Sequence, residues 1–357
     1  MSLFVRHISF LYLKSFFILF VSLECFFVSI DLVKYLDKLP SSANLIVLLV
    51  CYDFVYASNF ILPLTLILAQ IVLLVSLLRN SQWTAFLALG YSKARIFFPI
   101  FLIAFSITLF YICLNATPFA YAKERVDLII EEGFLGTYKS GLFIKYNNTY
   151  IYFARIFPFL QSAEGVKIYE FSEDNAEVVK IIEAPKAEFF EGQWILQDAQ
   201  ITTLAKDLEL GKTPLSFETQ ERYITLEGFK PKILDNIYEK ESNVSILDAY
   251  EAILLLNEQG ALTHKVRATL YSLIFFPLFA PLMMMCLSYW TPNSNRYVSL
   301  AGVTLGMILI ALVGWGIFFS LTRFSISGFL QPELSIIFPT IFLALISFFL
   351  FFRVMRE

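Results

Sequence analysis

Six long apolar segments dominate this sequence of 357 residues. A helix that spans a membrane needs about 20 predominantly apolar residues, and each segment is long enough. The segments are residues 8–36, 52–78, 97–118, 266–290, 298–322 and 333–353. Only 16% of all residues are charged, whereas an ordinary soluble domain has about a quarter. We therefore predict a helical membrane protein with six transmembrane helices, three on each side of one long polar segment.

The basic residues of the short loops predict how the chain is oriented, because Lys and Arg are enriched in cytoplasmic loops. One side of the membrane collects seven of them: Arg6, Arg79, Lys93, Arg95, Arg296, Arg353 and Arg356. The other side has three: Lys34, Lys38 and Arg323. Both termini and the loop 79–96 are therefore expected in the cytoplasm. The long polar segment, residues 121–263, is expected on the opposite side.

The polar segment has the pattern of a β-rich domain. Short runs in it alternate apolar and polar residues, for example residues 150–153, 166–171 and 194–197, and turn-forming residues separate the runs. Alternation with period two and regular turns is typical of an antiparallel sandwich or jellyroll. From Ser245 to Gln259 the spacing changes to that of an amphipathic helix, and Ser245 is a suitable N-cap.

The sequence lacks the motifs that bind cofactors or carry out catalysis. It has no phosphate-binding G-x-x-x-x-G-K-[ST] loop and no G-x-S-x-G turn. Its two histidines, His7 and His264, are far apart and belong to no H-E-x-x-H motif. No basic stripe with interleaved aromatic residues suggests a nucleic-acid partner. We expect no cofactor, no metal and no intrinsic enzymatic activity.

The first apolar segment carries charged residues at helical spacing. At 100° per residue, Glu24, Asp31, Lys34 and Lys38 fall within an arc of about 80°. Charge is costly in hydrocarbon, so this face is expected to point into a cavity or at a partner. The two lysines at its outer end suit the phosphates of an anionic headgroup. The alternative is that they simply reach the membrane surface beside the helix end.

The loop after the second segment predicts a short amphipathic helix. Trp83, Phe86 and Leu87 give it an apolar side, and Gly90 is a suitable stop. Such a helix either lies on the membrane surface or docks into a groove of a soluble partner.

The fifth segment contains the spacing G-x-x-x-G, formed by Gly302 and Gly306. Small residues at this spacing let two helix backbones approach closely. They indicate a helix–helix interface, either within the chain or with another subunit.

Several ordered stretches together resemble a known family. Residues 80–95 have an alanine-rich middle and end in Gly90-Tyr91-Ser92, and Asn115 and Pro118 follow the third segment. Stretches 141–155, 168–171 and 186–196 lie in the β-rich part. This order is similar to that of the LptF/LptG family of lipopolysaccharide-export permeases, with 80–95 as its coupling helix. Residues 33–37 resemble the LptG branch more than the LptF branch.

The resemblance implies a fold and a function. Residues 1–120 would form transmembrane helices 1–3 with the coupling helix, 121–263 a periplasmic β-jellyroll ending in the amphipathic helix, and 264–357 helices 4–6. The chain would be a permease subunit of an ATP-driven exporter in the bacterial inner membrane. It would extract lipopolysaccharide from that membrane and pass it to periplasmic partners. Implied partners are a cytoplasmic LptB-like ATPase dimer, an LptF-like second permease, and LptC- and LptA-like bridge proteins.

The resemblance also implies roles for particular residues. Lys34 and Lys38 would contact lipid A phosphates, and Asp37 lies in the same stretch. The ATPase-coupling residues would be Gln82, Trp83, Phe86, Leu87 and Gly90. The lateral gate toward the second permease would include Gly302 and Gly306. One position departs from the family: Gln82 stands where a glutamate is usual, so an ion pair with the ATPase would be replaced by a hydrogen bond.

Two other classes of protein fit parts of the pattern. A membrane-anchored periplasmic sensor or scaffold would need the helices only as anchors, which leaves the charged face of the first segment unexplained. A different ABC-type permease that transmits motion to an external domain would carry that domain after the first of four spans. Here the polar segment follows the third of six.

Overall fold

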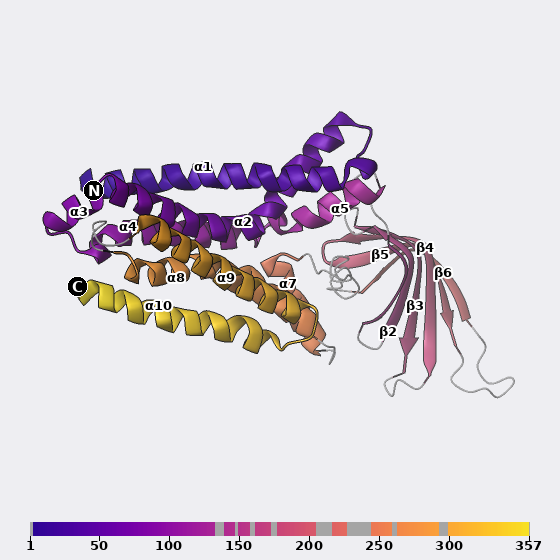
Figure 1. Cartoon of the computed structure of the whole chain (residues 1–357). Coiled ribbons are helices and arrows are strands. Elements are labelled where there is room, and N and C mark those ends of the chain that lie inside the picture. Colours follow the sequence, from indigo (N-terminus) through magenta and orange to yellow (C-terminus); the bar gives the residue numbers. More distant parts are fainter. Residues whose placement is uncertain are drawn as a thin grey trace. The chain divides into compact units, whose positions relative to one another are not determined.

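The computed structural model describes residues 3–132, 139–146, 149–157, 161–172, 177–204, 216–226, 244–258, 263–292 and 299–356 (Figure 1). The chain divides into two compact units. The helical unit comprises Met1–Val126, Asn243–Ile253 and Leu262–Glu357. The β unit comprises Asp127–Ser242 and Leu254–Ala261.

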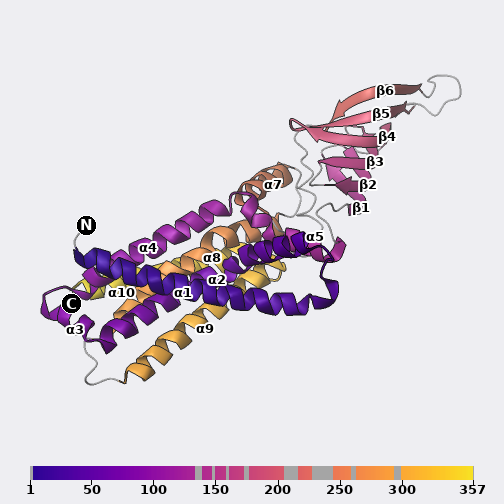
Figure 2. The same cartoon turned by 90° about the horizontal axis from the view of Figure 1, so that it is seen from above.

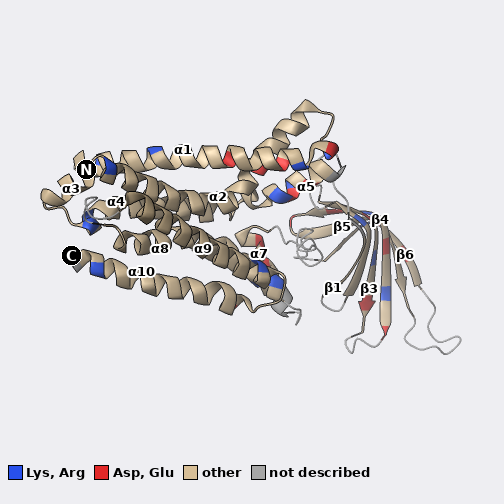
Figure 3. Cartoon of the chain, viewed as in Figure 1, with Lys and Arg blue, Asp and Glu red and all other residues tan. Residues whose placement is uncertain are grey.

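The helical unit contains six helices that are long and apolar enough to cross a membrane. Among the described residues they are α1 (Leu3–Lys34), α2 (Ala43–Arg79), α4 (Lys93–Leu114), α8 (His264–Tyr289), α9 (Leu300–Ile326) and α10 (Phe338–Arg356). A π-helical turn, η3 (Glu333–Ile337), leads directly into α10. Figure 3 shows that most charged residues of this unit lie near the helix ends. The six predicted spans are confirmed, and α2 begins nine residues earlier than predicted.

Two of these helices form the centre of the helical unit. In the most apolar stretch of each helix, 72% of the residues of α2 and 61% of those of α8 are buried. The corresponding fractions are 17% for α1 and 11% for α9. The shared core includes Leu66 and Ile67 of α2 and Phe279 of α8. The outer helices therefore present large apolar surfaces, which suit contact with lipid or with another membrane protein.

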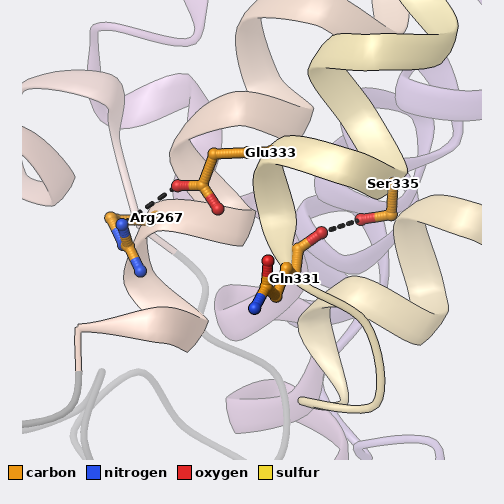
Figure 4. A network of polar contacts seen from close by, with 4 residues as sticks. All are labelled: Arg267, Gln331, Glu333 and Ser335. Atoms are coloured by element: carbon orange, nitrogen blue, oxygen red, sulfur yellow. Dashed lines mark hydrogen bonds and ion pairs between the residues drawn. The ribbon is translucent and has the colours of Figure 1, made fainter.

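An ion pair joins the beginning of α8 to η3, the turn that leads into α10 (Figure 4). Arg267 donates from Nη1 to Oε1 of Glu333 at 3.0 Å. In the same turn the Ser335 hydroxyl donates to the backbone carbonyl of Gln331 at 2.9 Å. Both charged side chains are partly exposed, so the pair contributes about 0–1 kcal/mol and mainly fixes where α10 begins.

Shorter helices connect the spans. They are η1 (Leu36–Lys38), α3 (Gln82–Ala88), η2 (Pro118–Tyr121), α5 (Ala122–Glu132) and α7 (Ile246–Glu258). Figures 1 and 2 both place α3 and the two chain termini at the same end of the helical unit. The predicted helix after Ser245 is confirmed as α7, and the backbone N–H of Asp248 donates to the Ser245 hydroxyl at 3.1 Å, as an N-cap requires.

The β unit contains one antiparallel sheet of six strands in chain order. The strands are β1 (Lys139–Tyr146), β2 (Thr149–Phe157), β3 (Ser162–Phe171), β4 (Val178–Phe190), β5 (Gln193–Thr203) and β6 (Ser216–Thr225). Glu191 and Gly192 form the two-residue turn between β4 and β5, and both have positive φ, 50° and 84°. This is the hairpin geometry that matches strand twist.

One face of the sheet is an apolar core. Phe153 and Trp194 are fully buried, and their ring centroids lie 5.4 Å apart. Alternate residues on five strands extend this core, as the period-two pattern predicted. The predicted antiparallel, jellyroll-like domain is thereby confirmed. Its described strands all belong to one sheet rather than to the two sheets of a sandwich.

Candidate functional site

The proposed lipid-contact residues lie where α1 ends. Lys34 is the last residue of α1, whereas Asp37 and Lys38 belong to η1, and all three are exposed. The Lys34 ammonium donates to the Tyr35 hydroxyl at 3.4 Å and lies 4.9 Å from the centre of that ring. Because α1 stops at Lys34, Lys38 does not continue its helical face. The prediction that all four charged residues share one face of a single helix is therefore wrong for Lys38.

The charged face of α1 turns inward at Glu24. This side chain is fully buried, and the Ser58 hydroxyl of α2 donates to its Oε1 at 3.0 Å. The second oxygen, Oε2, has no hydrogen-bond partner among the described residues. The prediction that this face points into a cavity or at a partner is thus wrong for Glu24, which packs against α2 of its own chain. A buried polar contact of this kind fixes which face of α1 meets α2.

The loop after α2 forms α3, a helix of 7 residues. Trp83 is fully buried, with its ring 5.5 Å from that of Phe97 on α4. Phe86 lies against Phe4 of α1 at 5.0 Å, and Leu87 packs against the same core. The apolar side of α3 therefore covers the chain's own helices. The Trp83 ring is not available to a partner, contrary to the expectation that docking rests on it.

The outward side of α3 carries mostly apolar residues and Thr84. Its exposed residues include Ala85, Ala88 and Leu89, and Leu89 is 74% exposed. Gln82 is partly buried at the start of the helix. Gly90 has a φ of 81°, which lets the chain leave the helix, so the predicted glycine stop is confirmed.

The G-x-x-x-G spacing on α9 does not mediate packing within the described part of the chain. A Cβ added at Gly302 would contact only the side chain of Ser299 on its own segment, with 2.6 Å between that Cβ and the Ser299 hydroxyl oxygen. A Cβ added at Gly306 would have no atom within 4 Å. Close packing occurs instead at Gly314, where a Cβ would lie 3.3 Å from Phe279 of α8. Sequence reasoning missed Gly314. The face with Gly302 and Gly306 is left open.

Two segments of the helical unit that lead toward the β unit are tied to each other. The backbone N–H of Ile246 donates to the carbonyl of Asn115 at 3.0 Å. The Tyr121 hydroxyl donates to the Asp248 carboxylate, and the Ser245 hydroxyl donates to the same carboxylate at 2.8 Å. Burial and the bond to Asp248 raise the pKa of Tyr121 above its ordinary value, so its phenol stays protonated and remains a donor. We call Tyr121, Ser245 and Asp248 the Tyr121 clasp.

Tyr121→Phe should loosen this clasp. A hydrogen bond to a charged group contributes about 1.5–3 kcal/mol, so amide exchange over residues 244–250 should accelerate roughly tenfold or more. The measurement is hydrogen–deuterium exchange of the detergent-purified protein. Tyr250→Phe is the control, because that ring lies on the same helix and is 56% exposed. Equal exchange in both variants would show that the clasp does not hold α7.

Within the described residues, no group of three or more His, Cys, Asp or Glu side chains could hold a metal ion. The features that stand out are instead exposed lysines at a helix end, an open glycine face and broad apolar helix surfaces. With six membrane-length helices and an antiparallel β unit, they define the class as a multi-pass membrane protein that carries one β domain.

The chain belongs to the lipopolysaccharide export system permease LptF/LptG family, whose model matches residues 6–353. The match spans both units, so the resemblance noted in the sequence is confirmed over nearly the whole chain. The family consists of permease components of an exporter. A comparison with curated proteins found no match.

Proposed function

We propose that this chain is the LptG-type transmembrane permease subunit of an ATP-driven lipopolysaccharide exporter in a bacterial inner membrane. The observation that carries the proposal is the family match over residues 6–353. The subunit extracts lipopolysaccharide from the inner membrane and passes it to periplasmic jellyroll proteins like LptC and LptA. Both termini lie in the cytoplasm and the β unit lies in the periplasm, in line with the seven-to-three distribution of basic residues.

The lipid's phosphates are bound at the end of α1. Lys34 and Lys38 are exposed cations within five residues of each other, at the level where headgroups lie. The Asp37 carboxylate lies between the two lysines in the sequence and partly offsets their positive charge. The acyl chains need an apolar surface, which the sparsely buried α1 and α9 provide. A second, LptF-like permease would complete the cavity and approach α9 at Gly302 and Gly306.

The energy is supplied by a cytoplasmic ATPase dimer like LptB. Lipid extraction is uphill, and this chain has no phosphate-binding loop of its own. The coupling element is α3, at the same end of the helical unit as the termini. Its buried Trp83, with the partly buried Phe86 and Leu87, anchors it to the membrane helices. The exposed Ala85, Ala88 and Leu89 contact the ATPase, Gln82 adds a hydrogen bond, and Gly90 ends the element.

The β unit shields acyl chains during transfer. Its core lies on one face of a sheet whose edge strands are β1 and β6. A jellyroll with an apolar interior can hold hydrocarbon chains in water, because burial of their surface is favourable by about 25 cal/mol per Å².

Purification from the native membrane tests this function. A tag on this chain should bring down a P-loop ATPase and a second six-span permease in stoichiometric amounts. Leu89→Asp should release the ATPase, because it places a charge in the docking surface while the anchor residues stay intact. Leu89→Met, which keeps an apolar side chain of similar volume at the same position, is the matched control. A chain that purifies alone would instead favour a sensor or scaffold.

A further inference from the structure

The helical unit contains an apolar groove distant from the end of α1 that carries Lys34. Its volume is about 430 Å³, and its walls come from α1, α4 and α10. Phe98 and Leu102 of α4 and Met355 of α10 line it, and each is more than half exposed. Binding sites for small apolar ligands commonly have volumes of about 300–1,000 Å³.

One end of the groove carries a cation. Arg95 lines it and is exposed, and no ion pair of Arg95 is found among the described residues. It lies in the first turn of α4, the end of the helical unit where the chain termini are also found (Figure 2). A guanidinium at a membrane surface, above an apolar groove, is suited to bind a phosphate with two parallel hydrogen bonds.

A backbone carbonyl beside this cation lacks its usual partner. Pro99 lines the groove and has no N–H, so the carbonyl of Arg95, four residues earlier, cannot receive the regular helical hydrogen bond. This carbonyl can accept a hydrogen bond from a hydroxyl or an ammonium group of a ligand.

A buried hydroxyl lies farther along the groove. Ser9 of α1 lines it, is only 8% exposed, and its Oγ has no hydrogen-bond partner among the described residues. Serines inside helices usually donate to the carbonyl four residues earlier, as Ser22 does to Ile18 at 2.7 Å. An unsatisfied buried hydroxyl is unfavourable, and an ester carbonyl of a bound lipid would satisfy it by accepting its hydrogen bond.

We propose that this groove binds one glycerophospholipid from the adjacent membrane leaflet. The phosphate lies on Arg95, an ester carbonyl accepts from Ser9, and one acyl chain follows α4 from Arg95 to Ile103. Eight residues of helix correspond to about 12 Å, close to the depth of one leaflet's hydrocarbon. A groove of about 430 Å³ holds this one chain and is too small for a lipid with several acyl chains. The site goes beyond the proposed export function and does not depend on it.

Photo-crosslinking tests the proposal with the full chain and its co-purifying subunits in vesicles of phosphatidylethanolamine and phosphatidylglycerol. The crosslinking residue p-benzoylphenylalanine replaces Leu102, which lines the groove. In the matched control it replaces Leu109, which lies on the same helix outside the groove and is 44% exposed. Adducts are identified by mass spectrometry. Phospholipid should be captured at both positions, but Arg95→Gln should reduce the adduct roughly tenfold at 102 only. Arg79→Gln, at an exposed arginine outside the groove, should change neither.

A second variant tests the groove itself. Ile103→Trp fills it and should also reduce the adduct at 102 while leaving that at 109 unchanged. If neither Arg95→Gln nor Ile103→Trp changed the amount of adduct at position 102, the crosslinker would be capturing only bulk lipid. That result would overturn the proposal. Capture at 102 of a peptide, or of lipopolysaccharide when it is added to the vesicles, would overturn it as well.

Discussion

Trp83→Ala is expected to lower the free energy of unfolding of the helical unit by about 3–5 kcal/mol, because it leaves a large cavity where a buried ring packed. The ring is fully buried and lies 5.5 Å from that of Phe97. Since α3 has only 7 residues, it has little stability of its own and depends on this anchor. The measurement is thermal unfolding of the detergent-purified protein, followed by intrinsic fluorescence.

The control for this variant is Trp290→Ala at the end of α8, where the side chain is 50% exposed. Its loss should cost much less, because fewer contacts are removed. If ATPase binding were lost in Trp83→Ala with no loss of stability, the ring would be a docking residue after all. Equal destabilisation by both variants would contradict the anchoring role.

Charge reversal at Lys34 and Lys38 together should reduce photo-crosslinking of lipopolysaccharide to α1 by at least tenfold. Each charge-assisted hydrogen bond to a phosphate contributes about 1.5–3 kcal/mol, and the glutamates would repel the lipid. Both side chains are exposed, so the reversal leaves the helical core unchanged. Crosslinks are counted in membranes that contain the complete exporter.

Replacement of both lysines by arginine is the matched control, because it keeps the charge and changes only the shape of the cation. Crosslinking should remain near that of the natural protein. If reversal left crosslinking unchanged, the lysines would serve only to reach the membrane surface. If arginine abolished it too, charge would not be the property that matters.

Hydrophobic length and alternation were sufficient to predict the architecture. Membrane spans depend on local composition, and the strands depend on period-two burial, so both are visible without knowing what packs where. Helix α5 was missed, because its charged and apolar residues were interpreted as part of the β-rich segment. Each strand pairs with the next one along the chain in a single sheet, whereas a sandwich would divide the strands between two sheets. The period-two pattern is the same in both arrangements and does not choose between them.

The candidate site was predicted less completely, since burial depends on neighbours. Helical spacing placed Glu24 on a face of α1, but only the packing against α2 shows that Ser58 covers it. Trp83 fitted an amphipathic pattern equally well whether its ring met a partner or its own chain. Gly314, rather than Gly302, packs against α8 because the crossing point of two helices is set by the whole bundle.

ATP-dependent release of lipopolysaccharide from proteoliposomes tests whether this chain works as an export permease. The complex purified through this chain is reconstituted with lipopolysaccharide, and the lipid transferred to a soluble periplasmic acceptor is measured with and without ATP. Transfer is expected to require ATP and to fall when Lys34 and Lys38 carry reversed charge. ATP hydrolysis without transfer, or transfer indifferent to ATP, would contradict it.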